Sequence, residues 1–575
     1  MNVLYVVVGA AIILGVAYVT YGKFLSEKVF QLEDKNVTPA VELEDGRDFV
    51  PVSKSMLLGQ HFSAIAAAGP ISGPILAAVL FGWVPALIWI IVGCIFIGGM
   101  HDMGSLVASM RYKAKSITEV IRQNVSARAW ILFMLFIWIT LVYVIVAFTD
   151  VTASSFVGNV TLESGEVVRG AGIASSSLMY LVLPIIMGLM MRYMKLSEGL
   201  ATAIFLPLVG VAIWCGQYLP ISLPFDDVAT QQQAWGVMIL VYCVIASVVP
   251  MWLLLQPRGA LGGYFLYIAL AVAAVGIIFG GYEIKYPAFI NINIDGSMGE
   301  NFWTPMFPIL FITIACGACS GFHSLVSSGT TSKQVKMETD AKPVGYGSML
   351  LEGLVAVVSV ACVMILSQDS ETVRQAPNFV YAKGIGSFME LIGVPAAFGI
   401  SFGLMAFTTF VYDTLDVCTR LGRYIIEELT GMKGMKGAII GTLLTAGVPG
   451  LLVFQTVTDA SGNAIPAWRL FWNIFGASNQ LLAALALIGV SVWLMKSRRD
   501  SKVWIAAFIP AMIMLVMSNW ALITFIHTGW VLGKGHPIIP IISAVLMVLS
   551  ALVCVETFHS MFMKKDDDKG SIAEA

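Results

Sequence analysis

The chain has 575 residues with a formal net charge of −2; 58% of its residues are hydrophobic and only 12% are charged. A soluble domain carries about 25% charged residues, so a chain of this composition cannot hide its apolar surface from water and must fold in lipid. The near-neutral charge excludes the basic surface that binds nucleic acid, and we expect no nucleic-acid partner.

A helix needs about 20 apolar residues to cross a bilayer, and the sequence contains 15 runs of that kind. The first run lacks the basic start and the cleavage site of a signal peptide, so we expect a retained helix there. The sequence therefore predicts an all-α, polytopic membrane protein, with residues 1–575 in a single transmembrane domain. In chain order, the predicted spans are 3–21, 56–80, 84–109, 129–151, 175–192, 198–217, 235–255, 259–280, 303–328, 344–367, 394–417, 437–456, 471–495, 503–526 and 537–558.

Lysines and arginines lie mainly on one side of this predicted topology. With the N-terminus outside, 27 of the 33 basic residues fall in loops on one side of the membrane, Arg258 among them. Because positive residues collect in cytoplasmic loops, the bias predicts an outside N-terminus and a cytoplasmic C-terminus. The loop 22–55 and the tail 559–575 are then cytoplasmic, and we expect the tail to be disordered.

Two Gly-Pro pairs interrupt the second predicted span. Gly69-Pro70 and Gly73-Pro74 lie near its centre, in the run GQHFSAIAAAGPISGPILAAVLFGW. Proline lacks a backbone donor and clashes with the preceding turn, so we expect the helix to unwind over 69–74. Free peptide groups at mid-membrane are costly unless protein, water or a ligand satisfies them. The unwound stretch should therefore line a cavity.

The predicted span 303–328 is interrupted by Gly317, Gly321 and a cluster of serines and threonines. It crosses in the opposite direction to span 56–80, and such a pair indicates an inverted-repeat transporter with the substrate between the breaks. Helix N-termini at the breaks should attract an anionic group; proline kinks and small-residue packing are the alternative. The candidate substrate-binding residues are Gly69, Pro70, Ser72, Gly73, Pro74, Gly317, Ser320, Gly321, His323 and Ser324.

Ionisable residues inside the predicted spans are few, and each is a candidate for proton or ion coupling. Histidine, with an ordinary pKa of about 6.5, suits a proton pathway, whereas a neutral packed histidine is the alternative. Glu352 has no basic residue within two helical turns in the sequence. Asp416 precedes Arg420 by four residues, and we expect the two to pair. The coupling candidates are His61, Asp102, Glu352 and Asp413.

Three uncharged polar residues, Gln60, Asn479 and Gln480, either bond helices together or reach the substrate. We expect no metal site, because no ligand spacing joins His61 to His323 and the pair Cys316–Cys319 lies in an apolar run that favours packing. No catalytic or nucleotide-binding motif occurs in the sequence. We therefore expect neither an enzyme nor a cofactor, and an ion gradient as the energy source.

Six segments resemble the carbon starvation protein family, and they run through most of the chain. Several are long and specific, although Gln60-His61 stands where many relatives have two successive histidines. The segments are GQHFSAIAAAGPISGPILAA (59–78), MRYKAKSITEVI (110–121), SGFHSLVSSGTTSKQ (320–334), GYGSMLLEGLVAVVSV (345–360), TLDVCTRLGRYIIEEL (414–429) and FWNIFGASNQLLAALAL (471–487).

This resemblance implies a protein of the cytoplasmic membrane of bacteria or archaea, associated with peptide uptake during carbon starvation or with proton-coupled pyruvate uptake. It also implies the amino acid–polyamine–organocation superfamily, whose leucine-transporter-like core consists of five plus five inverted helices. The two repeats would cover roughly 55–217 and 300–456, with inserted helices at 235–280 and accessory helices at 471–558.

We therefore expect a secondary active importer that works by alternating access on a small peptide or a carboxylate such as pyruvate. Its other partners are the lipid bilayer and a coupling proton or sodium ion. An ion or solute channel, which needs a continuous polar stripe, and a membrane sensor, which needs a signalling domain, are the alternatives from other classes. The sequence leaves the oligomeric state open.

Overall fold

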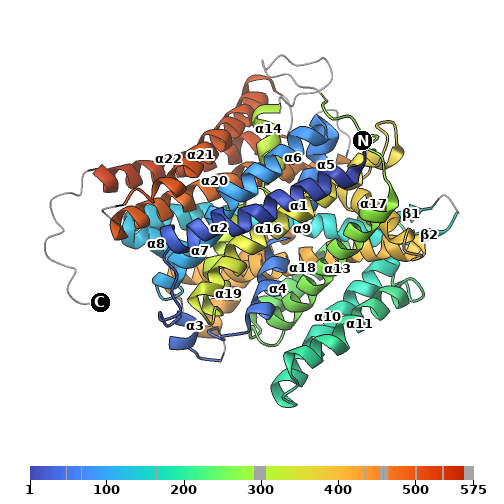
Figure 1. The fold of residues 1–575 in the computed structure, drawn as a ribbon, viewed down its shortest axis with the longest axis horizontal. Helices are drawn as coiled ribbons and strands as arrows, with labels where there is room; N and C mark the ends of the chain where they lie inside the picture. Colours follow the sequence, from blue (N-terminus) through green and yellow to red (C-terminus); the bar gives the residue numbers. More distant parts are fainter. Residues whose placement is uncertain are drawn as a thin grey trace.

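The computed structural model describes all residues of the chain except 47, 67, 163–164, 291–305, 433, 454–456, 459–463, 466, 499–500, 534–535 and 563–575. Long helices dominate it, and most of them run along the longest axis of the molecule (Figure 1). Within the described residues, 13 helices are long and apolar enough to cross a membrane, or 14 when the bent pair α4–α5 counts as one span.

The first half of the chain contains helices and one short hairpin. Strands β1 (Asn159–Thr161) and β2 (Val167–Arg169) pair antiparallel, with Asn159 opposite Arg169. The helices are α1 (Val3–Val19), α2 (Tyr21–Phe24), η1 (Leu25–Val29), α3 (Pro39–Glu42), α4 (Lys54–Ile65), α5 (Gly69–Phe81), α6 (Trp83–Val92), η2 (Gly93–Gly98), α7 (Gly99–Arg111), α8 (Ile117–Asn124), α9 (Ala127–Val157), α10 (Gly170–Tyr193), α11 (Glu198–Gly216), α12 (Val228–Val248) and α13 (Leu255–Gly280).

The second half of the chain likewise contains helices and one short pair of strands. Strands β3 (Val457–Thr458) and β4 (Ala464–Ile465) form another antiparallel pair. The helices are α14 (Met306–Thr313), α15 (Phe322–Gly329), η3 (Thr331–Lys333), η4 (Glu338–Asp340), η5 (Lys342–Gly347), α16 (Ser348–Met364), η6 (Glu371–Arg374), α17 (Pro377–Glu390), α18 (Ala396–Thr430), α19 (Gly434–Val453), α20 (Ala467–Ser497), α21 (Ile505–Ile526), η7 (His527–Val531) and α22 (Ile538–Phe562).

The order of the helices confirms the predicted all-α, multi-pass fold. Among the predicted spans, 303–328 differs most from a continuous helix. Its two helices, α14 and α15, have only eight residues each, and a non-helical stretch, 314–321, separates them. Of the predicted tail 559–575, the residues through Phe562 continue α22, and the rest lies outside the described residues.

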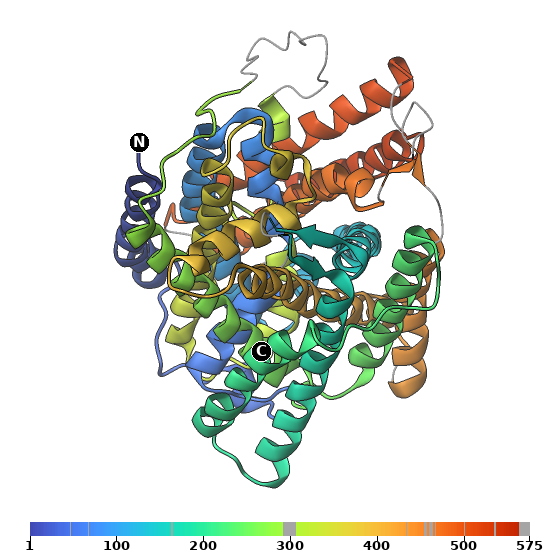
Figure 2. The same cartoon turned by 90° about the vertical axis from the view of Figure 1, so that its right-hand side faces the viewer.

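The spans differ in how deeply they lie in the protein. In the span 470–497, 94% of the most apolar window is buried, against 28% in the first span, which contains α1. Figure 1 shows α1 across the front of the molecule, and the turned view of Figure 2 places it at the left edge; the pair α10–α11 lies at the lower edge in both. The central helices therefore face protein on all sides, whereas the outer helices present apolar side chains to lipid.

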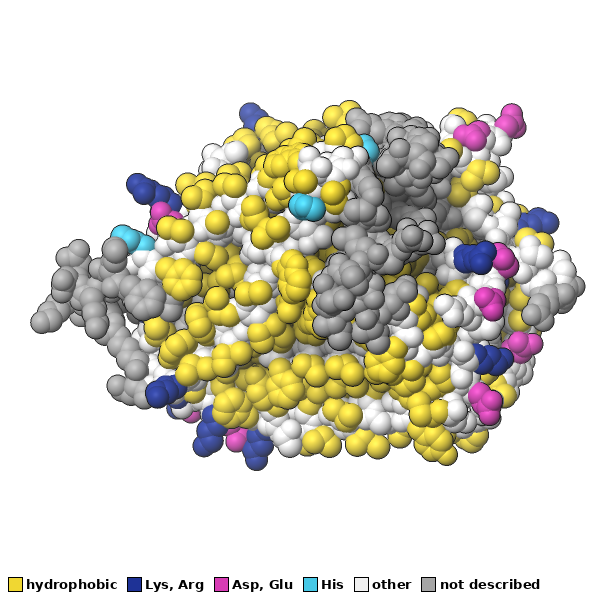
Figure 3. Space-filling view, turned by 90° about the horizontal axis from the view of Figure 1, so that it is seen from above, with side chains coloured by type: hydrophobic (Ala, Val, Ile, Leu, Met, Phe, Trp, Pro, Cys, Tyr) yellow, Lys and Arg dark blue, Asp and Glu magenta, His cyan; other side chains and the backbone are white. Residues whose placement is uncertain are grey.

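The surface fits a membrane-spanning orientation. Figure 3 shows a broad hydrophobic band on one face, with charged side chains gathered toward the two ends. In Figure 1 the chain starts at one end of the molecule and α22 finishes at the opposite end. Which end faces the cytoplasm stays a prediction. The placement of Arg258 in a loop was wrong, because this residue lies in α13 and is 1% exposed.

Candidate substrate and proton site

The first interruption lies between α4 and α5, which are bent by 43° relative to each other. It precedes the Gly-Pro pairs, so the prediction that 69–74 unwinds was wrong: α5 begins at Gly69 and continues through Pro74. Pro70 falls in the first turn of α5, where a helix does not use the missing N–H. Proline here starts a helix, and the chain bends just before it.

The second interruption is present where the sequence predicted it. The chain leaves α14 after Thr313 and re-enters a helix at Phe322. Gly317 has a φ of +86°, a backbone conformation that glycine adopts without steric cost. The freed carbonyl of Ile314 accepts hydrogen bonds from Trp89 Nε1, at 3.0 Å, and Gln480 Nε2, at 3.5 Å. Side chains thus satisfy part of this unwound backbone.

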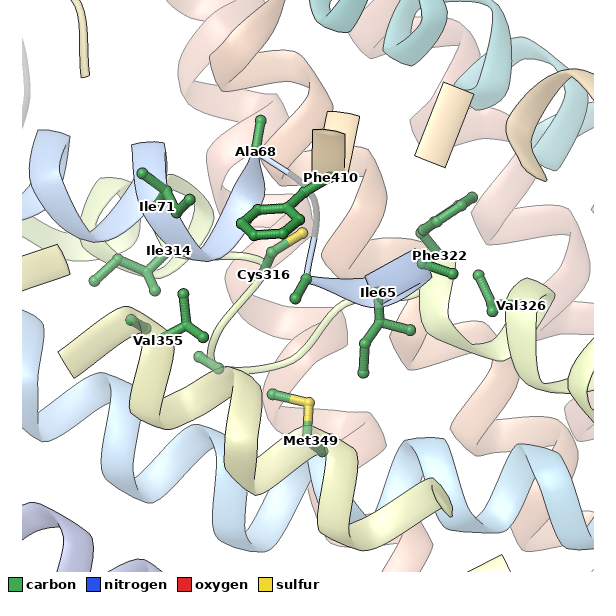
Figure 4. Close-up of a cluster of buried hydrophobic side chains, with 14 of the residues drawn as sticks. Ile65, Ala68, Ile71, Ile314, Cys316, Phe322, Val326, Met349, Val355 and Phe410 are labelled. Carbon is green, nitrogen blue, oxygen red and sulfur yellow. The ribbon is translucent and has the colours of Figure 1, made fainter. Parts of the chain in front are cut away.

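The two interruptions lie against each other. A Cβ atom on Gly69 would collide with the side chain of Cys316, and one on Gly73 would collide with the carbonyl of Thr313. Glycine at these positions therefore lets α5 approach the irregular segment closely. Figure 4 shows Ile65 and Ala68, which flank the first interruption, and near them Cys316 of the second interruption. The two interruptions meet in the interior of the protein.

Asn479 of α20 holds the start of α15. Its Oδ1 accepts the N–H of Phe322 at 2.9 Å, its Nδ2 donates to Ser320 Oγ at 2.9 Å, and its backbone carbonyl accepts the N–H of Gly321 at 3.0 Å. This is a side-chain cap of the α15 N-terminus. The expectation that this N-terminus is free for an anion was wrong, because protein atoms already occupy it.

The start of α5 is likewise unsuited to an anion. Pro70 has no N–H, and the N–H groups of Ile71 and Ser72 donate to the carbonyl of Ala68 at 3.3 and 2.8 Å. Several polar side-chain atoms on and around the breaks are buried without a hydrogen-bond partner in the described part of the chain. These atoms are Gln60 Oε1, His61 Nε2, Ser72 Oγ, Thr313 Oγ1, Ser327 Oγ and Gln480 Oε1. Such atoms need water or a bound solute.

A cluster of four buried side chains, here called the histidine cluster, lies beside the second interruption: His101, Asp102, His323 and Glu352. Asp102 accepts from both imidazoles, at 2.7 Å from His101 Nδ1 and 2.8 Å from His323 Nδ1. The other carboxylate, Glu352, accepts the N–H of Gly317 through Oε1 at 2.9 Å. All four side chains are 0% exposed.

One contact in the histidine cluster brings together two atoms that both accept hydrogen bonds. Since Nδ1 of His323 donates to Asp102, the remaining ring atom, Nε2, is a lone-pair acceptor in the neutral imidazole. Nε2 faces Glu352 Oε2 at 3.3 Å, and neither atom has another hydrogen-bond partner among the described residues. Two acceptors at this separation in a dry interior repel unless one proton, on either side, lies between them.

Cys316 Sγ completes a group of three donor atoms with His323 and Glu352, all within 4.8 Å of one another. Thiol, imidazole and carboxylate are ligand types that zinc accepts, so by chemistry alone these residues are able to hold a metal. A single proton satisfies the His323–Glu352 contact more simply, and we assign no metal here. Cys316, expected from its apolar run to be a packing residue, lies beside the candidate proton pair, a position that no local pattern indicates.

A second buried group, here called the arginine cluster, joins α4, α12, α13 and α18: Ser63, Tyr242, Arg258, Asp413 and Asp416. Arg258 Nε donates to Asp413 Oδ1 at 2.6 Å, while Nη1 donates to Tyr242 OH and lies 2.6 Å from Asp416 Oδ2 in an ion pair. Tyr242 OH donates to Asp416 Oδ2 at 2.9 Å, and Ser63 Oγ bonds Asp413. The guanidinium therefore neutralises aspartates that lie one turn apart on α18.

The partner predicted for Asp416 was wrong. Arg420 instead donates through Nη2 to the carbonyls of Ala246 and Val249, at 2.8 and 2.7 Å, at the end of α12. Arg258 was missed as the partner because it had been assigned to a loop. Pro257 carried the signal for the start of α13, since proline favours the first turn of a helix.

The remaining sequence candidates are placed as follows. His61 is 1% exposed and bonds Thr331 Oγ1 through Nδ1 at 2.8 Å, so it joins α4 to the segment after α15. Ser324 Oγ donates to the carbonyl of Gly321 at 2.7 Å. The amide of Gln480 also donates to the carbonyl of Phe311 at 2.5 Å. The contacts of Ser324 and Gln480 support the two ends of the interrupted segment.

Comparison with known proteins finds one family model, "Carbon starvation protein CstA", that matches residues 2–378 and 367–521. A "Peptide transporter CstA" of Helicobacter pylori is 32% identical, with 91% of this chain and 82% of that protein covered. The "Peptide transporter CstA" of Bacillus subtilis is 29% identical, with 96% of each chain covered. The "Pyruvate/proton symporter BtsT" of Escherichia coli is 29% identical, with 91% and 81% covered.

Among solved structures, a manganese transporter of Eremococcus coleocola superposes with a TM-score of 0.49 at 12% identity, covering 90% of this chain and 98% of that one. This likeness is too weak to define the fold.

Proposed function

Because the chain belongs to the carbon starvation protein CstA family, we propose that it is a secondary active importer that moves peptides or small carboxylates such as pyruvate together with a proton. Relatives named as peptide transporters and as a pyruvate/proton symporter support both substrate classes. The cytoplasmic membrane, with the N-terminus outside, is the location that the Lys and Arg distribution favours.

The substrate site lies between the two interruptions. Ser72 and Thr313 offer buried hydroxyls without partners there, and Gln480 offers a carbonyl oxygen. Gly69 and Gly73 allow α5 to lie close to the second interruption, because a side chain at either position would collide with Cys316 or Thr313. Binding of a solute satisfies these atoms in the loaded state, and water satisfies them in the empty state.

The core repeats proposed here differ from the expected 55–217 and 300–456, because they also include α20, which the family resemblance placed among the accessory helices. Asn479 and Gln480 of this helix bond both ends of the second interruption, and the span that contains them is 94% buried in its most apolar window. Contacts of α13 with α4 and of α20 with α14 and α15 support an inverted pair of repeats, each with its last helix against the broken one.

The contact that carries the proton assignment is the one between His323 Nε2 and Glu352 Oε2, at 3.3 Å. One proton on this pair changes repulsion into a hydrogen bond, and Asp102 holds the ring in the orientation that the bond needs. Loss of that proton destabilises the contact between α15 and α16. Protonation from one side of the membrane and release to the other thereby couples the gradient to movement of the interrupted segment.

The test is uptake into proteoliposomes that contain the purified chain. Labelled pyruvate and labelled di- and tripeptides are compared under an imposed pH gradient, with and without a protonophore. Saturable uptake that the gradient drives, together with counterflow, supports the carrier. Flux that does not saturate and ignores the gradient indicates the channel alternative and contradicts the proposal.

A further inference from the structure

A cavity of about 570 Å³ lies at the C-terminal end of α15. Leu325, Ser328 and Gly329 of α15 form one wall, and the others are formed by Leu43, Phe49, the 113–116 segment and residues of α8, α9 and the end of α18. Its volume lies within the roughly 300–1,000 Å³ of small-molecule sites. Its charged lining residues are Lys113, Lys115, Glu119, Arg122, Lys333 and Glu428.

Positive charge exceeds negative charge in this lining, with four basic and two acidic side chains. Glu119 is already shared by Lys115, at 3.5 Å, and Arg122, at 3.4 Å. Glu428 accepts a hydrogen bond from Trp130 Nε1 at 3.2 Å. In the part of the chain that the structure describes, no carboxylate forms an ion pair with Lys333.

Lys333 is held in place by aromatic rings. Its Nζ lies 4.9 Å from the ring centroid of Tyr424 and 5.7 Å from that of Phe49. Its carbonyl accepts the N–H of Val50 at 3.2 Å, and this bond connects the loop before α4 to the end of η3. Aromatic faces attract the ammonium but leave its N–H donors without an anionic acceptor. A half-buried cation of this kind is suited to an incoming anion.

The cavity is close to the proposed transport path. Ser328 follows His323 by five residues on α15, which corresponds to about 7.5 Å along a helix axis. The helix N-termini at the interruptions are occupied, by Asn479 in α15 and by Ala68 in α5. A transported carboxylate therefore needs another cation, and Lys333 lies in η3, the short helix that follows the C-terminal end of α15.

We propose that this cavity is a second binding site for the transported carboxylate, on the cytoplasmic side, with Lys333 receiving its anionic group before release. The inference rests on the proposed function, since it names the chemical class that the carrier recognises. The shared chemistry of the site is a small anion, and a lipid phosphate headgroup is the competing source.

The experiment measures counterflow of pyruvate and dialanine in proteoliposomes of zwitterionic lipid. Lys333→Gln is expected to raise KM for both carboxylates about tenfold, the loss of one charge-assisted contact, with less effect on dialanine amide, which lacks the carboxylate. Lys333→Arg should restore KM to within about threefold, since it keeps the charge. Lys336→Gln, an exposed lysine outside the lining, is the matched control and should match the wild type.

Equal KM values for Lys333→Gln and Lys336→Gln would overturn the inference. A second series in vesicles with phosphatidylglycerol separates the two anion sources. An effect of Lys333→Gln that occurs only with this anionic lipid would assign the cavity to a headgroup and overturn the substrate role. Absence of counterflow by the wild type would instead contradict the proposed function itself, and every variant would then equal empty liposomes.

Discussion

The histidine cluster and the arginine cluster both bury charge in the membrane interior, but they differ in what their protons are able to do. Arg258 keeps its charge at every physiological pH and bonds Asp413 and Asp416 directly. His323 and Glu352 face each other with two acceptor atoms that a single proton would join. The first arrangement suits a fixed connection between helices, and the second suits a site that gains and loses a proton.

This difference also separates two coupling candidates that looked alike in the sequence. Asp413 and Glu352 are both buried carboxylates in spans. Asp413 has a permanent cation at 2.6 Å, whereas Glu352 has only a titratable imidazole and a backbone N–H. We therefore propose Glu352, with His323 and Asp102, as the coupling group. Under this proposal Asp413 has a structural role: it connects α18 to α13 through Arg258 and to α4 through Ser63.

The largest effect is expected from Glu352→Gln. Glutamine keeps an acceptor for the N–H of Gly317 and donates an N–H to His323 Nε2, so it imitates the protonated state permanently. Gradient-driven uptake should fall to the level of empty liposomes, while counterflow at equal pH and the amount of protein in the membrane are retained. Glu390→Gln, at the exposed end of α17, is the control. Wild-type uptake by Glu352→Gln would move the proton site elsewhere.

Arg258→Met should act on stability before activity. Removing one partner of a buried ion pair leaves uncompensated charge and costs about 3–5 kcal/mol, and here two aspartates lose their cation. We expect a lower melting temperature of the purified protein and less protein in the membrane. The triple variant Arg258→Met with Asp413→Asn and Asp416→Asn should recover much of the loss. Normal stability of Arg258→Met would show that the arginine cluster is not a structural connection.

Asn479→Ala should have an intermediate effect on the second interruption. The variant loses the side-chain bonds to Phe322 and Ser320 but keeps the backbone bond to Gly321. Loss of a helix cap costs about 1–2 kcal/mol, which thermal unfolding in detergent would detect. Asn479→Asp keeps the acceptor for the N–H of Phe322 and should cost less; an equal loss in both variants would contradict the capping role.

His61→Asn should have the smallest effect. His61 makes one side-chain hydrogen bond, to Thr331, and asparagine is able to reform a bond of that kind. We expect a change of about 1 kcal/mol or less in stability and uptake within about threefold of the wild type. Complete loss of gradient-driven uptake, with Glu352→Gln still active, would transfer the coupling role to His61.

Much of the fold was predictable because lipid restricts the choices. Apolar runs of about 20 residues in a bilayer form helices, and the structure has such helices in the predicted order. The position of the first break was not predictable from Gly69 and Pro70, because proline stops one helix and starts the next with the same chemistry. Only the geometry shows that the bend falls before them.

The sequence predicted which types of residue form the site, but it did not predict which of these side chains contact each other. Ionisable residues in apolar runs are expected to be buried, as Asp102, His323 and Glu352 are. However, Asp102 and His323 are 221 positions apart in the sequence, and no local pattern joins them. The error over Arg258 had the same origin, since spacing along α18 pointed to Arg420 while the true partner came from α13.

By itself, the sequence determined that the chain lies in a membrane, that its elements are helices, and that two spans are interrupted, because these follow from local hydrophobicity and backbone chemistry. Tertiary structure alone decided which buried charge meets which. Helices from distant parts of the chain bring their side chains together, and charge pairing in a dry interior depends on distances of a few ångströms that no local pattern encodes.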